Sequence, residues 1–244
     1  MGVSADPTGL DTNNYIKIRN IDLFNGHDKN LLMRFTKDTW LDTIYADGAD
    51  WEEGIAYYNN NYNAHVDSVT LNNNGRYGFM WNGANADSLI LNNIVADGNT
   101  RYGIMLSGAN AIINNAEVDG LFLYDIYDNC NNHTLSNLLV DGKDVSTFPA
   151  LNLHGGINNI NITDLRIDNC GDGYGIWSHQ LMSDCPTNVT ITREGIYNHT
   201  GTDVQIDCGD VQFIDFSWSG SPYEALIHEK TTLIHNGVVL IFKR

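Results

Sequence analysis

The chain has 244 residues, a formal net charge of −17 and 42% hydrophobic residues, so it is long enough for one large β domain or two smaller domains with a core. Its negative field disfavours nucleic acid and anionic lipid as partners. The same field disfavours a polyanionic substrate unless bound Ca²⁺ or local basic residues offset it.

The first predicted elements are short apolar strands that recur at a nearly regular interval. The strongest internal match sets the segment 76–85 beside the segment 101–110. Extending this register predicts a series of inward-facing centres, one per interval, at Leu32, Ile55, Phe79, Ile104, Ile126, Leu151, Ile176, Val204 and Leu226. Each interval is interpreted as one coil of a solenoid.

A second strand with alternating apolar and polar residues is predicted in most coils, as half-buried strands require. These segments are 18–24, 69–71, 89–95, 111–118, 135–140, 160–167 and 189–191. Asp-Gly pairs such as Asp47-Gly48 and Asp119-Gly120 end several strands and indicate turns, with a Ca²⁺ ladder as the alternative. Asn93, Asn115 and Asn137 are evenly spaced and predict an amide ladder inside a bend.

Together these patterns predict an all-β, single-stranded, right-handed parallel β-helix of about nine coils. We expect one domain over 1–244, with 1–14 as an N-terminal lead-in and 230–244 as a C-terminal cap or assembly strand. An exposed edge there would favour self-association through the solenoid ends. A leucine-rich repeat solenoid shares the period, but its residue frame is not kept here.

The remaining general features concern membranes, metals and disulfides. No run approaches about 18 apolar residues, and residues 1–6 lack a signal-peptide pattern, so no membrane insertion is expected. The four cysteines have no metal-type spacing, and Ca²⁺ is the only cofactor considered. Cys170 and Cys185 flank one predicted coil and could pair, whereas Cys130 and Cys208 lie about 14 Å apart in the predicted register, too far for a bridge.

Residues beside each inward centre should point to solvent and form columns, with one step of about 4.8 Å per coil. Directly after the centre lie Met33, Ala56, Met80, Met105, Tyr127, Asn152, Trp177 and Gln205. Two places before it lie Tyr77, Tyr102, Tyr124 and Tyr174. An exposed aromatic and Met stripe of this kind predicts a surface for sugar rings or for a partner subunit, and burial beneath a loop is the alternative.

The candidate catalytic residues lie three places after the centre. This column contains Asn129, His154, His179, Asp207 and Glu229. Two histidines on adjacent coils, followed by an acid, suggest proton transfer, because histidine titrates near neutral pH and a carboxylate can orient it.

The chain resembles the right-handed β-helix superfamily of pectate lyases, alginate lyases, mannuronan C5-epimerases and phage tailspikes. The resemblance covers about Tyr15 to Phe216 and rests on repeats such as Asn-Asn-x-Ile and Tyr-Gly-Ile-x. The segment from Tyr174 to His179, Tyr-Gly-Ile-Trp-Ser-His, is similar to the Tyr-Gly-Phe-Asp-Pro-His segment of the epimerases, whose Tyr, Asp and His take part in proton transfer. Trp177 stands where that family has its Asp.

The resemblance implies an extracellular or cell-surface protein, with its leader absent from this sequence, that binds a glycan or processes a polysaccharide. As a lyase or epimerase, it would use His179 or His154 to remove a proton, Tyr174 to donate one and Asp207 to tune the histidine. A uronate substrate would also need a cation such as Arg166 or Ca²⁺ near its developing charge.

Two other functions fit the sequence. Hydrolysis of a neutral glycan would use two carboxylates. The candidates are Asp125, Asp128, Asp203 and Asp207. The alternative to any enzyme is a non-catalytic adhesin, filament or tailspike-type structural module.

Overall fold

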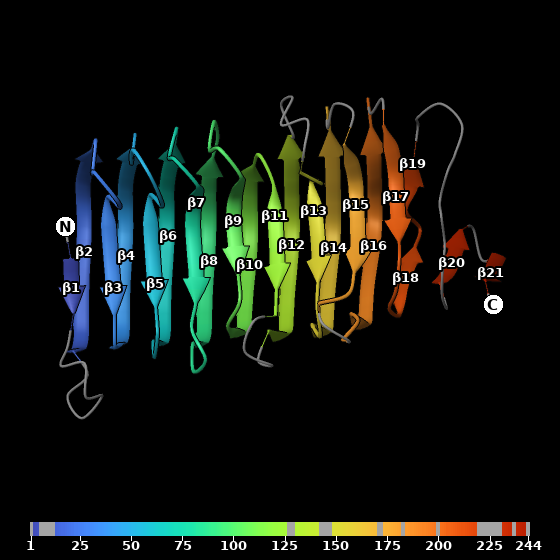
Figure 1. Cartoon of the computed structure of the whole chain (residues 1–244), viewed down its shortest axis with the longest axis horizontal. Coiled ribbons are helices and arrows are strands. Elements are labelled where there is room, and N and C mark those ends of the chain that lie inside the picture. The colour runs from blue at the N-terminus through green and yellow to red at the C-terminus, as the bar shows by residue number, and fades with distance from the viewer. Residues whose placement is uncertain are drawn as a thin grey trace.

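The computed structural model of the chain is a parallel β-helix built from two long sheets (Figure 1). It describes residues 2–4, 13–125, 130–141, 148–169, 173–181, 184–198, 201–218, 231–235 and 238–242. From the N-terminus to the C-terminus, the chain runs down in the nearer sheet and up in the farther one while it advances along the axis, which is a right-handed path (Figure 1). The predicted right-handed parallel β-helix is therefore confirmed.

The nearer sheet, called sheet A, contains nine short strands. They are β1 (Gly2–Ser4), β3 (Leu31–Arg34), β5 (Ile55–Tyr58), β7 (Tyr77–Asn82), β9 (Tyr102–Leu106), β11 (Leu121–Tyr124), β13 (Leu151–His154), β15 (Tyr174–His179) and β17 (Thr202–Ile206). One such strand per coil agrees with the prediction of about nine coils.

The farther sheet, called sheet B, contains twelve strands, most of them longer. They are β2 (Asn13–Phe24), β4 (Thr36–Asp47), β6 (Tyr62–Asn72), β8 (Asp87–Ala96), β10 (Ala109–Val118), β12 (Asn131–Asp141), β14 (Asn158–Asp168), β16 (Thr187–Tyr197), β18 (Val211–Ile214), β19 (Ser217–Trp218), β20 (Thr231–His235) and β21 (Val238–Phe242). The predicted second strands lie in this sheet, and β21 closes it with an antiparallel pairing to β20. The described residues include no helix of the length and apolarity that crossing a bilayer requires.

The core is the space between the sheets, where one side chain per coil repeats at the same place. In sheet A the observed column of buried centres is Leu31, Ile55, Phe79, Ile104, Leu121, Leu151, Ile176 and Val204. Six of the predicted centres are correct, but Leu31 replaces Leu32 and Leu121 replaces Ile126. The predicted centres Ile126 and Leu226 lie outside the described residues.

The error at Ile126 has a physical cause. Strand β11 begins directly after the turn at Asp119 and Gly120, so its centre follows Ile104 after a short segment and precedes Leu151 by a long one. A short coil followed by a long one has the same total length as two regular coils, so the regular period misplaces the centre between them. The strands still stack normally, because the number of loop residues changes the sequence interval between centres and not the pairing of the strands.

Asparagine is abundant because sheet B bends at backbone positions with positive φ. Asn93, Asn115 and Asn137 lie at such a bend, with φ of 53°, 56° and 53°, a region that asparagine tolerates better than most residues. The Asn115 Nδ2 group donates to Asn93 Oδ1 at 3.2 Å, so these residues do stack in part. All three are exposed, which corrects their predicted place inside the bend.

A different set of amides forms a buried ladder. Asn30 Nδ2 donates to Asn74 Oδ1 at 3.3 Å, and Asn74 Nδ2 donates to Asn99 Oδ1 at 2.9 Å. In the next coil, Asp119 takes the place of the amide, and its Oδ2 accepts the Asn99 backbone N–H at 2.6 Å. Asp119 is therefore a buried ladder residue as well as the first residue of an Asp-Gly pair.

Candidate functional site

The outer face of sheet A carries the predicted columns, but its central part is covered. Met80 pairs with Met105, and both are outside the main core, as predicted. They are only 3% and 2% exposed, because the side chains of Tyr77 and Tyr102 pack with them in a second apolar cluster. The prediction of an exposed stripe is wrong for these four residues and for Asn152, which is 7% exposed.

Two members of the predicted columns, Tyr124 and Met33, occupy other places. Tyr124 is paired with His154, so it belongs to the histidine column and not with Tyr77. Phe122 takes the place predicted for Tyr127, which lies outside the described residues. Met33 is a core residue, because Leu32 pairs with Ala56.

Tyr124 and Phe122 differ from the predicted columns because the centre of this coil is Leu121 and not Ile126. The turn at Asp119 and Gly120, followed at once by Leu121, is the sequence signal that places both residues. Asn129 and Glu229, the other predicted members of the histidine column, lie outside the described residues.

A ladder of half-buried rings runs across the last coils of sheet A. The ring centroids are 4.8 Å apart for Tyr124 and His154, and 3.9 Å apart for His154 and His179. Trp177 stacks on His179, again at 3.9 Å, and Tyr174 packs against Trp177 at 5.2 Å in a tilted arrangement. Parallel strands in register stack Tyr124, His154 and His179, because equivalent side chains lie one strand spacing apart, whereas Trp177 contacts His179 from two residues earlier on the same strand.

Burial holds both histidines in the neutral form near pH 7. Burial, followed by the neighbouring His154, lowers the pKa of His179 to about 4, and the carboxylate of Asp207 opposes this only in part. Burial also lowers the pKa of His154, against a hydrogen bond with the Gln180 backbone. The two rings can therefore stack without repulsion between two cations.

The neutral His179 ring is oriented by a hydrogen-bonded chain. Asn152 Nδ2 donates to the Tyr102 hydroxyl at 2.9 Å, which leaves Asn152 Oδ1 to accept from His179 Nε2 at 2.9 Å. With the proton on Nε2, Nδ1 of His179 is an acceptor. Asn152 is thus a positioning residue in this arrangement, and the buried Tyr102 supports it.

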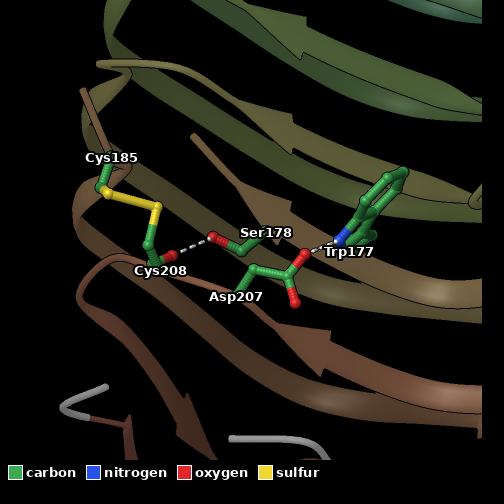
Figure 2. Close-up of a disulfide and its surroundings, with 5 residues drawn as sticks. All are labelled: Trp177, Ser178, Cys185, Asp207 and Cys208. Carbon is green, nitrogen blue, oxygen red and sulfur yellow. Dashed lines mark hydrogen bonds between the residues drawn. A yellow bond between two sulfur atoms is a disulfide. The ribbon is translucent and has the colours of Figure 1, made fainter. Parts of the chain in front are cut away.

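Asp207 contacts the tryptophan side of the site (Figure 2). Its Oδ2 accepts the Trp177 Nε1–H at 2.7 Å, and its Oδ1 accepts from Gln205 Nε2 at 2.7 Å. The charge of Asp207 raises the pKa of His179, but by less than burial lowers it. Tyr174, Trp177, His179 and Asp207 therefore come together on two adjacent coils.

A disulfide anchors this end of the site. Cys185 is bonded to Cys208, with Cα atoms 5.7 Å apart, so the predicted pairing of Cys170 with Cys185 is wrong (Figure 2). The Ser178 hydroxyl donates to the Cys208 carbonyl at 2.9 Å, which fixes the segment that carries Asp207 beside β15. Cys130 is a buried free thiol, and burial raises its pKa.

Of the other charged candidates, Arg166 lies away from this cluster. Arg166 lies in β14 of sheet B, where its Nε donates to Asp168 Oδ2 at 2.6 Å and its guanidinium lies over Tyr197. Asp125 is buried and accepts the Cys130 backbone N–H at 3.3 Å. Asp128 lies outside the described residues, and Asp203 is half-buried. Among the described residues, no three His, Cys, Asp or Glu side chains are grouped as a metal site would need.

The fold defines the class of this protein as a right-handed parallel β-helix. No protein-family model and no curated protein matches the sequence. Among solved structures, the chain is similar to tailspike protein 2 of Escherichia coli O157:H7 bacteriophage CAB120, with 11% identity and a TM-score of 0.33. That match covers 83% of this chain and 36% of the tailspike, so the chain spans about a third of the tailspike's length.

Proposed function

We propose that the protein is an extracellular carbohydrate-binding module that recognises a neutral glycan on the outer face of sheet A. The site consists of Tyr174, Trp177, His179, Gln205 and Asp207. One observation carries the proposal: the two packed rings of Tyr174 and Trp177, called the aromatic corner, lie beside hydrogen-bonding groups. These groups belong to Gln205 and Asp207 on the next coil, and a disulfide anchors the two coils. Sugars have apolar ring faces and polar hydroxyl edges, and aromatic side chains with a polar edge complement both.

The polarity of the site favours a neutral ligand. The histidines are uncharged near pH 7, and the carboxylate of Asp207 is occupied by the Trp177 indole and the Gln205 amide. Arg166, the cation expected to stabilise a uronate intermediate, lies on the other sheet. The negative charge of the chain would therefore repel a polyanionic substrate, and Arg166 is not near the site to compensate for that repulsion.

The extracellular location is part of the proposal. It is supported by the Cys185–Cys208 disulfide, because structural disulfides persist mainly in oxidising compartments.

A non-catalytic structural module is the second candidate. The burial of Met80, Met105, Tyr77 and Tyr102 favours it, since that part of the outer face is packing and not an open groove.

Binding is tested by isothermal titration calorimetry with cellohexaose, xylohexaose, mannohexaose and chitohexaose, and with polygalacturonate as the anionic comparison. Trp177→Ala is expected to weaken binding of the preferred neutral glycan at sheet A about tenfold or more, because it removes the aromatic corner. Trp51→Ala is the matched control, since Trp51 is 68% exposed and lies outside the site. Equal affinity at sheet A for the parent and Trp177→Ala would overturn the proposal.

Catalysis is tested separately by reducing-end release and unsaturated-product absorbance on the same glycans, with and without Ca²⁺. The binding proposal predicts no turnover. Turnover that is lost in the His154→Ala/His179→Ala double variant would instead assign an enzyme to this site. If the neutral glycans do not bind at sheet A and no turnover is found, the structural module is favoured.

A further inference from the structure

A second candidate site lies on sheet B, in the first coils and away from the residues described above. It is a shallow depression of about 290 Å³. The lining residues that matter are Tyr15, Lys17, Asp38, Trp40, Asn63 and His65. They come from β2, β4 and β6, three neighbouring strands of sheet B.

The floor is an aromatic stack set by strand register. Lys17 pairs with Trp40, and Trp40 pairs with His65. The Trp40 and His65 rings are 4.0 Å apart and nearly parallel, at 8°, while Lys17 Nζ lies 5.3 Å from the centre of the Trp40 ring. These contacts occupy the faces of Trp40, so the stack presents ring edges to the depression.

A free aromatic face comes from Tyr15. This residue is 79% exposed and lies at a left-handed backbone position, with φ of 58°. Of the exposed large aromatic residues in the described part of the chain, Tyr15 and Trp40 line this depression, whereas Phe24 and Trp51 are exposed outside its lining. An exposed ring beside a depression is an available platform for an apolar ligand face.

The polar rim supplies both donors and acceptors. Asp38 and Asn63 occupy left-handed positions on adjacent coils, and Asn63 Nδ2 donates to Asp38 Oδ1 at 2.6 Å. The second oxygen of Asp38, the Asn63 carbonyl and the Lys17 ammonium complete the rim. The charges of Lys17 and Asp38 cancel, so this part of a chain with net charge −17 is locally neutral.

We propose that this depression is a second carbohydrate site, which binds one pyranose ring of a neutral glycan. The apolar face of the sugar stacks on Tyr15 and rests on the edge of Trp40, while its hydroxyl groups bind Asp38, Asn63 and Lys17. An apolar floor, together with a neutral rim that supplies both hydrogen-bond donors and acceptors, matches a pyranose better than an ion. The site is on the opposite sheet from Trp177, so it stands independently of the function proposed for sheet A.

The test uses calorimetry with the four neutral hexasaccharides and compares two variants that suit their backbone positions. Tyr15→Asn keeps a residue that tolerates positive φ, and Trp40→Thr introduces the residue type that Thr134 and Thr190 supply elsewhere in the same column. Each variant is expected to weaken glycan binding at the sheet B site about tenfold and to leave the affinity of the Trp177-dependent site unchanged. Phe24→Ala, which removes another exposed ring of β2, is the control and should leave both affinities unchanged.

Stoichiometry separates the two proposals. With both correct, a glycan accepted by both sites binds twice per chain, Trp177→Ala leaves the Tyr15-dependent site, and Tyr15→Asn leaves the Trp177-dependent site. The sheet B proposal is overturned if no neutral glycan shows a Tyr15-dependent affinity, whatever happens at Trp177. It is also overturned if sedimentation shows that Tyr15→Asn and Trp40→Thr abolish self-association without affecting glycan binding, since a second copy of the chain would then be the occupant.

Discussion

Asp119 should make the stability of this β-helix depend on pH in an uncommon direction. The residue is 5% exposed, and its Oδ1 has no hydrogen-bond partner among the described residues. Burial, partly opposed by the hydrogen bond from the Asn99 backbone, raises its pKa from 3.8 to about 7. The perturbation is Asp119→Asn, which restores the amide found at Asn74 and Asn99 in the same ladder.

The magnitude follows from proton linkage. Below pH 3.8 the carboxyl is protonated in both states, and its stabilising effect in the folded state is fully present. Between pH 3.8 and 7 the unfolded chain releases the proton while the folded chain keeps it, so stability falls as pH rises. A pKa difference of about 3, at about 1.4 kcal/mol per pH unit, corresponds to a loss of about 4 kcal/mol in the unfolding free energy.

The assay is urea unfolding of the parent and Asp119→Asn at pH 4, 6 and 8, at one ionic strength. The stability gain of the variant over the parent should grow by up to about 4 kcal/mol from pH 4 to pH 8. The introduced amide can also donate, as Asn99 Nδ2 does to the Leu71 carbonyl. Asp22→Asn, a change at an exposed site in β2, is the control and should show no such trend. A pH-independent difference in unfolding free energy between the parent and Asp119→Asn would show that the Asp119 carboxyl has no raised pKa in the folded chain.

Three further predictions concern stability. In the Cys185→Ala/Cys208→Ala variant, the unfolding free energy measured with urea should fall by about 3 kcal/mol, since the disulfide closes a loop with a sequence separation of 23. An unchanged urea midpoint would contradict this prediction. Burial lowers the pKa of His133 to about 3, so as pH falls below 6.5 the unfolded chain binds a proton before the folded chain does. Between pH 6.5 and 4 the unfolding free energy of the parent should therefore fall by about 3 kcal/mol more than that of His133→Gln. Melting temperatures that fall in parallel for the two proteins would contradict this prediction. Asn115→Ala should cost about 1 kcal/mol while Asn115→Gly costs less, because φ is 56° there; equal costs by urea unfolding would argue against backbone strain.

The histidine ladder shows how far repeat analysis can reach a site. His154 and His179 are separated by one regular coil, which brings them to equivalent positions on paired strands, so their stacking could be predicted. Tyr124 and Phe122 could not be placed from the same period, because the stretch between Ile104 and Leu151 is divided unequally. The regular period describes strand stacking but carries no information about the loop lengths within each coil.

Burial and partner choice required the folded chain. Met80 and Met105 are on the predicted outer face, yet neighbouring rings cover them, and that covering depends on side-chain directions in several coils at once. Cys185 bonds to Cys208 and not to Cys170, because the path of the loops decides which Cα atoms approach. Asp207 is in its predicted column, but its carboxylate is bonded to the Trp177 indole.

The class of fold follows from the sequence alone, since a β-helix must place an apolar side chain at the same inward point in every coil and therefore repeats its pattern along the chain. The sequence also specifies which residue types line the outer face near Trp177 and His179. Packing between the coils sets which outward side chains remain accessible, which ring faces are already occupied and which charges are neutralised, as at Asp119. Those properties depend on distances between coils and on the surrounding packing, which a one-dimensional period does not contain.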